Sequence, residues 1–137
     1  CIMHGKVSRQ DAMKLQQSSD VLLVASYDYK DKEGGVVTGK VLEYMAAKRP
    51  VISIMMGDIE HSELSDIVRE TNIGIAYEDS NREEDYRKLY NYIKEQYQSF
   101  IETAQTEYEP DKRELRKYDY RYLCKRLIKI MNQVKRG

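Results

Sequence analysis

Hydrophobic positions in the first half of the chain fall into short continuous runs separated by segments with helical spacing. The apolar runs lie at residues 21–25, 51–55 and 73–77. Runs of this length are typical of strands covered on both faces, as in a parallel sheet. The segments with helical spacing are residues 8–18, 39–48 and 62–70. This alternation predicts βαβ units with right-handed crossovers, and hence an α/β fold with a Rossmann-like parallel sheet and flanking helices.

Single residues set the expected starts and inner faces of these helices. Ser8 and Thr38 precede the first and second helical segments, where a hydroxyl can cap free amides. The apolar residues expected to face inward are Ala12, Met13 and Leu15 in the first helix and Leu64, Ile67 and Val68 in the third. In parallel sheets, ligands bind beyond the carboxyl ends of the strands. The loop after residues 21–25 and the helix that follows it are therefore the first place to expect a site.

The second half of the chain is predicted to be helical. Residues 81–101 and 118–134 carry apolar or aromatic side chains at the i, i+3, i+4, i+7 spacing of one helix face. The first stripe consists of Tyr86, Leu89, Tyr90, Ile93, Tyr97, Phe100 and Ile101, and the second of Tyr120, Leu123, Cys124, Leu127, Met131 and Val134. We expect both stripes to pack on protein, with Cys124 as a small core residue.

Composition limits the class of protein. The 137 residues fit one domain, and 23 Lys and Arg against 23 Asp and Glu give zero net charge. Without net positive charge there is no long-range attraction to phosphate, so nucleic acid is not an expected partner. No apolar run approaches the roughly 20 residues of a membrane span. Cys1, Cys124, His4 and His61 lack metal-ligand spacing, so we expect no metal and a reducing, cytoplasmic setting.

The charge is nevertheless unevenly distributed. Residues 112–137 contain ten Lys and Arg and only two acids, which leaves 13 basic and 21 acidic residues in 1–111. Within the last helix, Arg121, Lys125 and Lys129 form a row at i, i+4, i+8. Such a row is usually a solvated helix face, and it is also suited to peripheral contact with an anionic membrane.

One segment carries a specific motif. Residues 35–52 read GVVTGKVLEYMAAKRPVI, with a small-residue loop, a Lys, a Glu-Tyr pair, a short helix and a Pro-Val step into the next strand. Three further segments occur in register with it, namely HGKVS at 4–8, SDVLL at 19–23 and TNIG at 71–74. Together they resemble the nucleotide-sugar-binding region of the group 1 glycosyltransferases, a retaining family with the GT-B fold. The resemblance covers residues 3–78.

The resemblance implies a donor-binding site at the helix that starts near Gly39. It implies that Glu43 binds the ribose, while the backbone at Thr38, Gly39 and Lys40 holds the diphosphate. Elementary chemistry agrees, because a helix N-terminus offers free amides and the positive end of its dipole to a phosphate. A carboxylate one turn into that helix is a natural acceptor for two hydroxyl groups.

Two glycines complete the implied donor site. Gly5 belongs to the step that lies near the base in the resembling enzymes, and Gly35 belongs to the loop where the backbone approaches the donor closely. Many members carry a second Glu at the position of Gly35, where it contacts the donor sugar. Glu33 is the nearest acid here and is displaced by two residues. The role of Glu33 in sugar recognition therefore stays open.

The implied activity is transfer of a sugar, with retention, from a nucleoside diphosphate sugar to an acceptor in polysaccharide or glycoconjugate synthesis. No cofactor and no metal are implied. Residues 1–110 would form part of a donor-binding Rossmann-like domain, and 111–137 a C-terminal helical segment. Because residue 1 is Cys and the acceptor-binding half is not found, we expect a C-terminal fragment. We expect this fragment to carry no catalytic residue, to be inactive alone and to pair with its own N-terminal domain.

Two other classes of protein remain open. A non-catalytic Rossmann-like interaction domain would account for the alternating strands and helices, but it would not account for a Lys-x-x-Glu-Tyr segment at a helix start. A sugar-nucleotide epimerase of related fold also pairs a helix N-terminus with a diphosphate. Product analysis of the longer protein would separate transfer from epimerisation.

Overall fold

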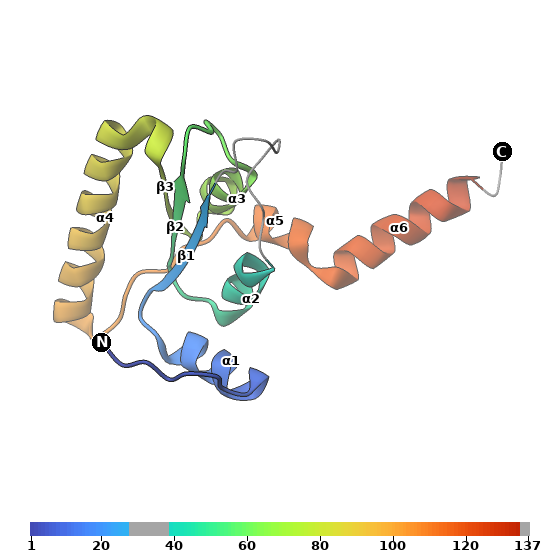
Figure 1. Cartoon of the computed structure of the whole chain (residues 1–137). Coiled ribbons are helices and arrows are strands. Elements are labelled where there is room, and N and C mark those ends of the chain that lie inside the picture. Colours follow the sequence, from blue (N-terminus) through green and yellow to red (C-terminus); the bar gives the residue numbers. More distant parts are fainter. Residues whose placement is uncertain (28–38, 135–137) are drawn as a thin grey trace.

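The computed structural model describes residues 1–27 and 39–134 (Figure 1). Strands and helices alternate over the first 78 residues, and the remainder of the described chain is helical. The elements are α1 (Arg9–Ser18), β1 (Leu22–Tyr27), α2 (Lys40–Ala47), β2 (Val51–Met56), α3 (Glu63–Thr71), β3 (Gly74–Glu78), η1 (Asp79–Asn81), α4 (Arg82–Thr103), α5 (Lys112–Leu115), η2 (Arg116–Tyr118) and α6 (Tyr120–Val134).

The described strands form one parallel sheet in the order β1-β2-β3. Leu22 of β1 is level with Val51 of β2, which in turn is level with Gly74 of β3. The carboxyl ends of the strands therefore meet at one edge. The predicted α/β class with a parallel sheet and flanking helices is confirmed, and the arrangement is compatible with a Rossmann-like fold.

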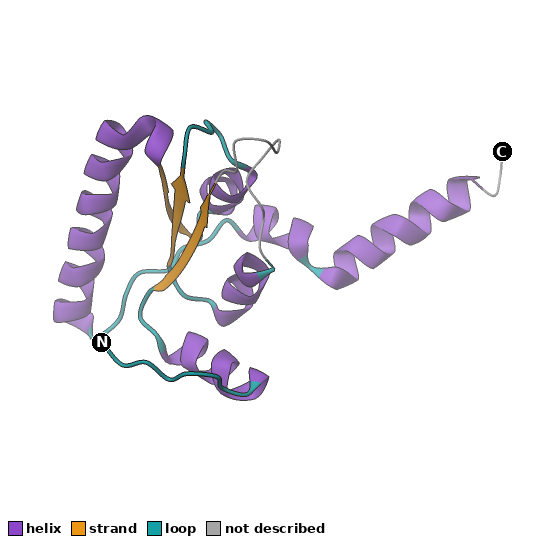
Figure 2. Ribbon diagram, viewed as in Figure 1, coloured by secondary structure: helices purple, strands orange, loops and turns teal. Residues whose placement is uncertain are grey.

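Helices flank the sheet on two sides (Figure 2). α2 and α3 cover one face, and α4 runs along the other face next to β3. The hydrophobic core lies between the sheet and the α2–α3 layer, and it consists of Leu22, Val24, Val41, Tyr44, Met45, Val51, Met55, Leu64, Ile67, Val68, Ile73 and Ala76. The three residues predicted to face inward from α3 are all in this core, so that prediction is confirmed.

The first helix begins as predicted but packs differently. Ser8 caps α1, because the Asp11 amide donates to its Oγ at 3.2 Å. Within Arg9–Ser18, however, no residue is buried, and Met13 and Leu15 are exposed. The prediction of an inward face on this helix is therefore wrong for the described chain. The reason is that α1 lies beside α2 at the end of the sheet (Figure 1) and does not lie on the sheet.

The edge strand β1 also departs from expectation. Its residues alternate between buried and exposed, and Leu23 is 58% exposed. The prediction that residues 21–25 form a strand covered on both faces is thus wrong for one face. α2 covers the face that carries Leu22 and Val24, whereas α4 contacts β3, at the other edge of the sheet.

The amphipathic stripes of the last two long helices are also uncovered. Tyr86, Tyr90 and Tyr97 of α4 are exposed, and within Tyr120–Val134 no residue of α6 is buried. Cys124 is exposed, so the prediction that it is a core residue is wrong. α6 projects away from the body of the molecule (Figure 1), which explains why nothing described in this chain covers it.

Candidate functional site

α2 is the helix that follows β1 in the chain, and it carries two of the predicted site residues, Lys40 and Glu43. Gly39 is the N-cap of α2, with φ −55°, and no described side chain caps the amides of the first turn. The first helical hydrogen bond of this turn runs from the Glu43 amide to the Gly39 carbonyl, at 3.3 Å. Amides that precede this bond have no partner within the helix, so they are suited to an anion.

A groove of about 320 Å³ lies between α1 and α2 and reaches the first residue of α6. It is lined by Arg9, Met13, Gln16, Gln17, Gly39, Leu42, Glu43, Ala46, Ala47 and Tyr120. Glu43 is exposed, and Gln16 Nε2 donates to its Oε2 at 3.4 Å. The structure thus brings two of the predicted site residues, Gly39 and Glu43, into one groove.

Glu43 and its neighbour Tyr44 point in different directions. The Tyr44 hydroxyl donates to the Leu23 carbonyl of β1 at 3.2 Å, and the ring is part of the core. Burial, followed by the charge of Glu43, raises the pKa of Tyr44. The Glu-Tyr pair therefore has a clear division of roles. Tyr44 anchors α2 to the sheet, while Glu43 is left to face the groove.

The other predicted site residues are placed less directly. Lys40 is the first residue of α2 and is exposed next to the groove-lining Gly39. Gly5 is exposed and has φ +63°, a left-handed conformation that side chains rarely adopt, and it leads into α1. Gly5 does not line the groove as described. Thr38 and Gly35, like Glu33, lie outside the described residues.

Sequence reasoning missed the contribution of α1 to this groove. Arg9, Met13 and Gln16 follow one another at i, i+4 and i+7, so they share one helix face. The sequence shows this spacing, but it does not show that this face of α1 packs beside α2. Arg9 adds a cation to the groove, at the first residue of α1.

A second cluster joins the carboxyl end of β3 to α3 and α4. Glu78 and Asp85 are both buried, and Arg69 bridges them at 3.1 and 3.3 Å. The Ser62 amide at the start of α3 donates to Glu78 Oε1 at 2.7 Å. The Glu78 amide donates to Asp85 Oδ2 at 3.0 Å. The two carboxylates therefore have hydrogen-bond partners within the protein, as expected of a structural cluster.

The Glu78 carboxyl is held in its charged form by this cluster. Burial acts to raise its pKa, but hydrogen bonds from Ser62, Ser65 and Arg69 outweigh burial and lower the pKa to about 2. Charge-assisted hydrogen bonds to a carboxylate have this effect, because they favour the ionised form.

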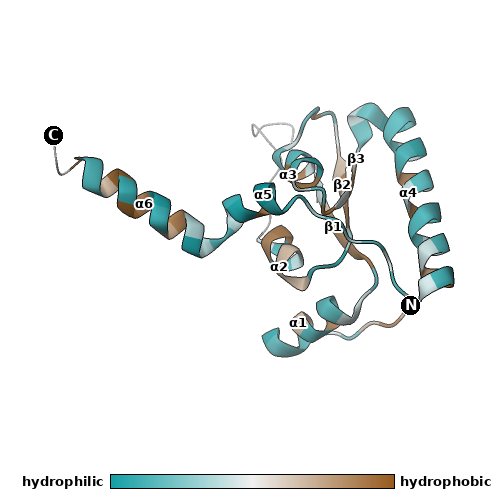
Figure 3. Ribbon diagram, turned by 180° about the vertical axis from the view of Figure 1, so that it is seen from behind, coloured by the Kyte–Doolittle hydropathy of each residue, from teal (hydrophilic) through white to brown (hydrophobic). Residues whose placement is uncertain are grey.

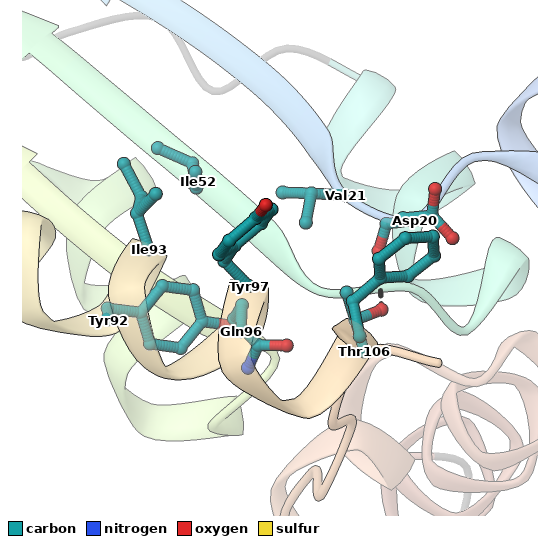
Figure 4. Close-up of a pocket in the computed structure, with 9 residues that line it drawn as sticks. Asp20, Val21, Ile52, Tyr92, Ile93, Gln96, Tyr97 and Thr106 are labelled. Atoms are coloured by element: carbon teal, nitrogen blue, oxygen red, sulfur yellow. Dashed lines mark hydrogen bonds between the residues drawn. The ribbon is translucent and has the colours of Figure 1, made fainter. Parts of the chain in front are cut away.

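A second hollow, of about 380 Å³, lies between α4 and the residues at which β1 and β2 begin. Tyr92 and Tyr97 of α4 line this hollow together with Val21, which precedes β1, and Ile52 of β2 (Figure 4). The Thr106 hydroxyl closes one end by donating to the Asp20 carbonyl at 2.7 Å. Burial raises the pKa of Tyr92 to about 12. This hollow is apolar and lacks charged groups apart from Asp20, so it is poorly suited to a diphosphate.

Comparisons of the chain with protein families, with curated proteins and with solved structures give no match. The class of the protein is thus defined here by the fold alone, as an α/β domain with a parallel sheet. No helix within residues 1–27 and 39–134 has the length and apolar character needed to cross a bilayer. In the same residues, no three His, Cys, Asp or Glu side chains gather as a metal site would require.

Proposed function

We propose that this chain is the donor-binding part of a glycosyltransferase that uses a nucleoside diphosphate sugar. The observation that carries the proposal is the groove beside α2, in which Gly39 at the helix start and Glu43 one turn later face the same space. The groove lies against the start of α2, and a helix start of this kind is suited to binding a phosphate. The resemblance of residues 35–52 to the donor motif supports the same position.

Different residues bind different parts of the donor. The uncapped amides after Gly39 donate hydrogen bonds to the diphosphate, and Lys40 and Arg9 add positive charge beside it. The Glu43 carboxylate accepts hydrogen bonds from the two ribose hydroxyls. These contacts fix the donor and stabilise the charge that develops on the leaving diphosphate, and both are sources of rate acceleration.

Binding of nucleotides to the 137-residue chain tests this proposal without an acceptor. Titration calorimetry with UDP, GDP and ADP is expected to give binding of at least one of them. Glu43→Ala is expected to weaken that binding by more than about 100-fold, because it removes two charge-assisted hydrogen bonds worth roughly 1.5–3 kcal/mol each. Glu70→Ala, an exposed change on α3, is the matched control and leaves binding unchanged. Absence of binding, or equal loss in both variants, would contradict the proposal.

One observation favours a second candidate, a non-catalytic interaction domain. The apolar hollow beside α4 and the exposed outer face of β1 offer surface to another protein segment. The nucleotide titration separates a glycosyltransferase from an interaction domain, because an interaction domain is not expected to bind nucleotides through Glu43. If sugar nucleotides are turned over, analysis of the products would separate sugar transfer from epimerisation.

A further inference from the structure

Hydrophilic and hydrophobic stretches follow one another along α6 (Figure 3), and their spacing gives the helix an apolar face and a cationic face. At about 100° per residue, its apolar side chains span an arc of about 160°. They are Tyr120, Leu123, Cys124, Leu127, Ile128, Ile130, Met131 and Val134. The opposite arc carries Arg121, Lys125, Arg126 and Lys129, together with Tyr122, Asn132 and Gln133. The segment contains no Asp or Glu between residues 120 and 134.

This helix is exposed along its whole described length. Leu127 is 57% exposed, and Ile128 and Met131 are similarly open to solvent. The start of the helix is nevertheless well fixed. Asp119 accepts from the Arg121 amide at 2.7 Å, and the Arg116 guanidinium lies 5.5 Å from the centre of the Tyr122 ring. The described chain thus presents this amphipathic helix with its apolar face uncovered.

Charge indicates the chemistry of the partner. The polar arc of α6 carries four cations and no acid, whereas residues 1–111 contain 13 basic and 21 acidic residues. An anionic surface would attract α6 and repel residues 1–111, which form the body of the molecule. Because α6 projects away from the body (Figure 1), the helix can lie on such a surface while the acidic body stays clear of it.

We propose that α6 is an interfacial helix that binds the surface of an anionic lipid bilayer. Its apolar arc enters the boundary between headgroups and acyl chains, and Arg121, Lys125 and Lys129 contact lipid phosphates. A helix of 15 residues is too short to span a bilayer but long enough to lie in its surface. A protein partner would need acidic residues around an apolar surface in order to match α6. A partner of that kind and a second copy of this chain are the two alternatives to a lipid surface.

Vesicle sedimentation tests the charge requirement. The chain is expected to sediment with vesicles of phosphatidylcholine and phosphatidylglycerol and to remain in solution with phosphatidylcholine alone. Changing Arg121, Lys125 and Lys129 to Gln is expected to weaken partitioning about 100-fold, since each cation contributes about fivefold. The matched control changes Lys14, Arg87 and Lys94, three exposed cations of the body, to Gln and keeps binding.

Two tryptophan reporters test the orientation, because the chain contains no Trp. Met131→Trp, on the apolar arc, is expected to shift its emission to the blue and to be quenched by brominated lipid when anionic vesicles are added. Gln133→Trp, on the polar arc, is expected to do neither. Equal sedimentation with neutral and anionic vesicles, or equal responses of the two reporters, overturns the proposal. Concentration-dependent self-association without vesicle binding would also overturn it, and would assign the apolar arc to a second copy of the chain.

Discussion

The α3–β3 region and the α4–α6 region have similar sequence patterns but very different surroundings. The apolar stripe of α3 is buried, with Leu64 and Val68 both at 0% exposure. The stripes of α4 and α6 lie open to solvent, with Tyr97 at 65%. The helical period is as clear in α6 as in α3, and it is weaker in α4. The difference shows that periodicity defines a helix face but does not define what covers that face.

The two regions also differ in how their polar groups are used. At the end of β3, Glu78 and Asp85 are buried and bridged by Arg69. In α6 every charged side chain is exposed. We infer that the α2–α3–β3 side carries the stability of the described chain, and that the open faces are available to other molecules.

The largest expected effect follows from substitution of Gly74. A Cβ added at Gly74 would lie 1.8 Å from the carbonyl oxygen of Val51, which is backbone of the central strand. That atom cannot move away without disturbing the sheet, so Gly74→Ala is expected to lower the free energy of unfolding by more than about 4 kcal/mol. Urea denaturation measures it. Gly39→Ala is the control, because its added Cβ meets nothing within 4 Å; equal stability of the two variants would contradict the account.

The next effect compares two leucines on the contrasting stripes. Leu64→Ala is expected to cost about 2–5 kcal/mol, because the side chain is fully buried. Leu127→Ala, at 57% exposure, is expected to change stability by less than about 0.5 kcal/mol. Thermal and urea unfolding of both variants measure the difference. A large loss of stability in Leu127→Ala would mean that α6 is packed against protein in solution. The contrast between the buried stripe of α3 and the exposed stripe of α6 would then not hold.

A smaller effect concerns pH. The folded-state pKa of Glu78 is about 2, below its ordinary value of 4.5. The charged carboxylate therefore stabilises the fold above pH 4.5, and this contribution is lost as the pH falls toward about 2. By linkage it amounts to about 3 kcal/mol at neutral pH. The wild-type chain is expected to lose stability more steeply than Glu78→Gln below pH 4.5. Parallel curves for the two proteins would show that Glu78 is not responsible.

Much of the fold could be predicted from the sequence because local rules decide it. The apolar runs gave the strands to within one or two residues, and Ser8 and Ser62 cap α1 and α3. The rest depends on tertiary placement. Nothing in residues 8–18 indicates that α1 lies beside α2 away from the sheet, and nothing in residues 118–134 indicates that α6 projects from the body.

The candidate site could be predicted only in part. Gly39 and Glu43 were identified by their motif, and they share one groove. Arg9 and Gln16 enter that groove from a helix about 30 residues earlier in the chain, and only the packing of α1 on α2 reveals this. The buried cluster at Glu78 was missed for the same reason, because Arg69 and Asp85 meet there from two different helices.

The central claim is that the groove between α1 and α2, and not the hollow beside α4, binds a nucleoside diphosphate. Amide chemical shifts of the labelled chain, recorded during titration with the nucleotide that binds, test it most directly. The account predicts that the largest changes fall on Gly39–Glu43 and on the first turn of α1, and that Glu43→Ala diminishes them. Changes centred on Tyr92, Tyr97 and Thr106, with none at Gly39–Glu43, would contradict it.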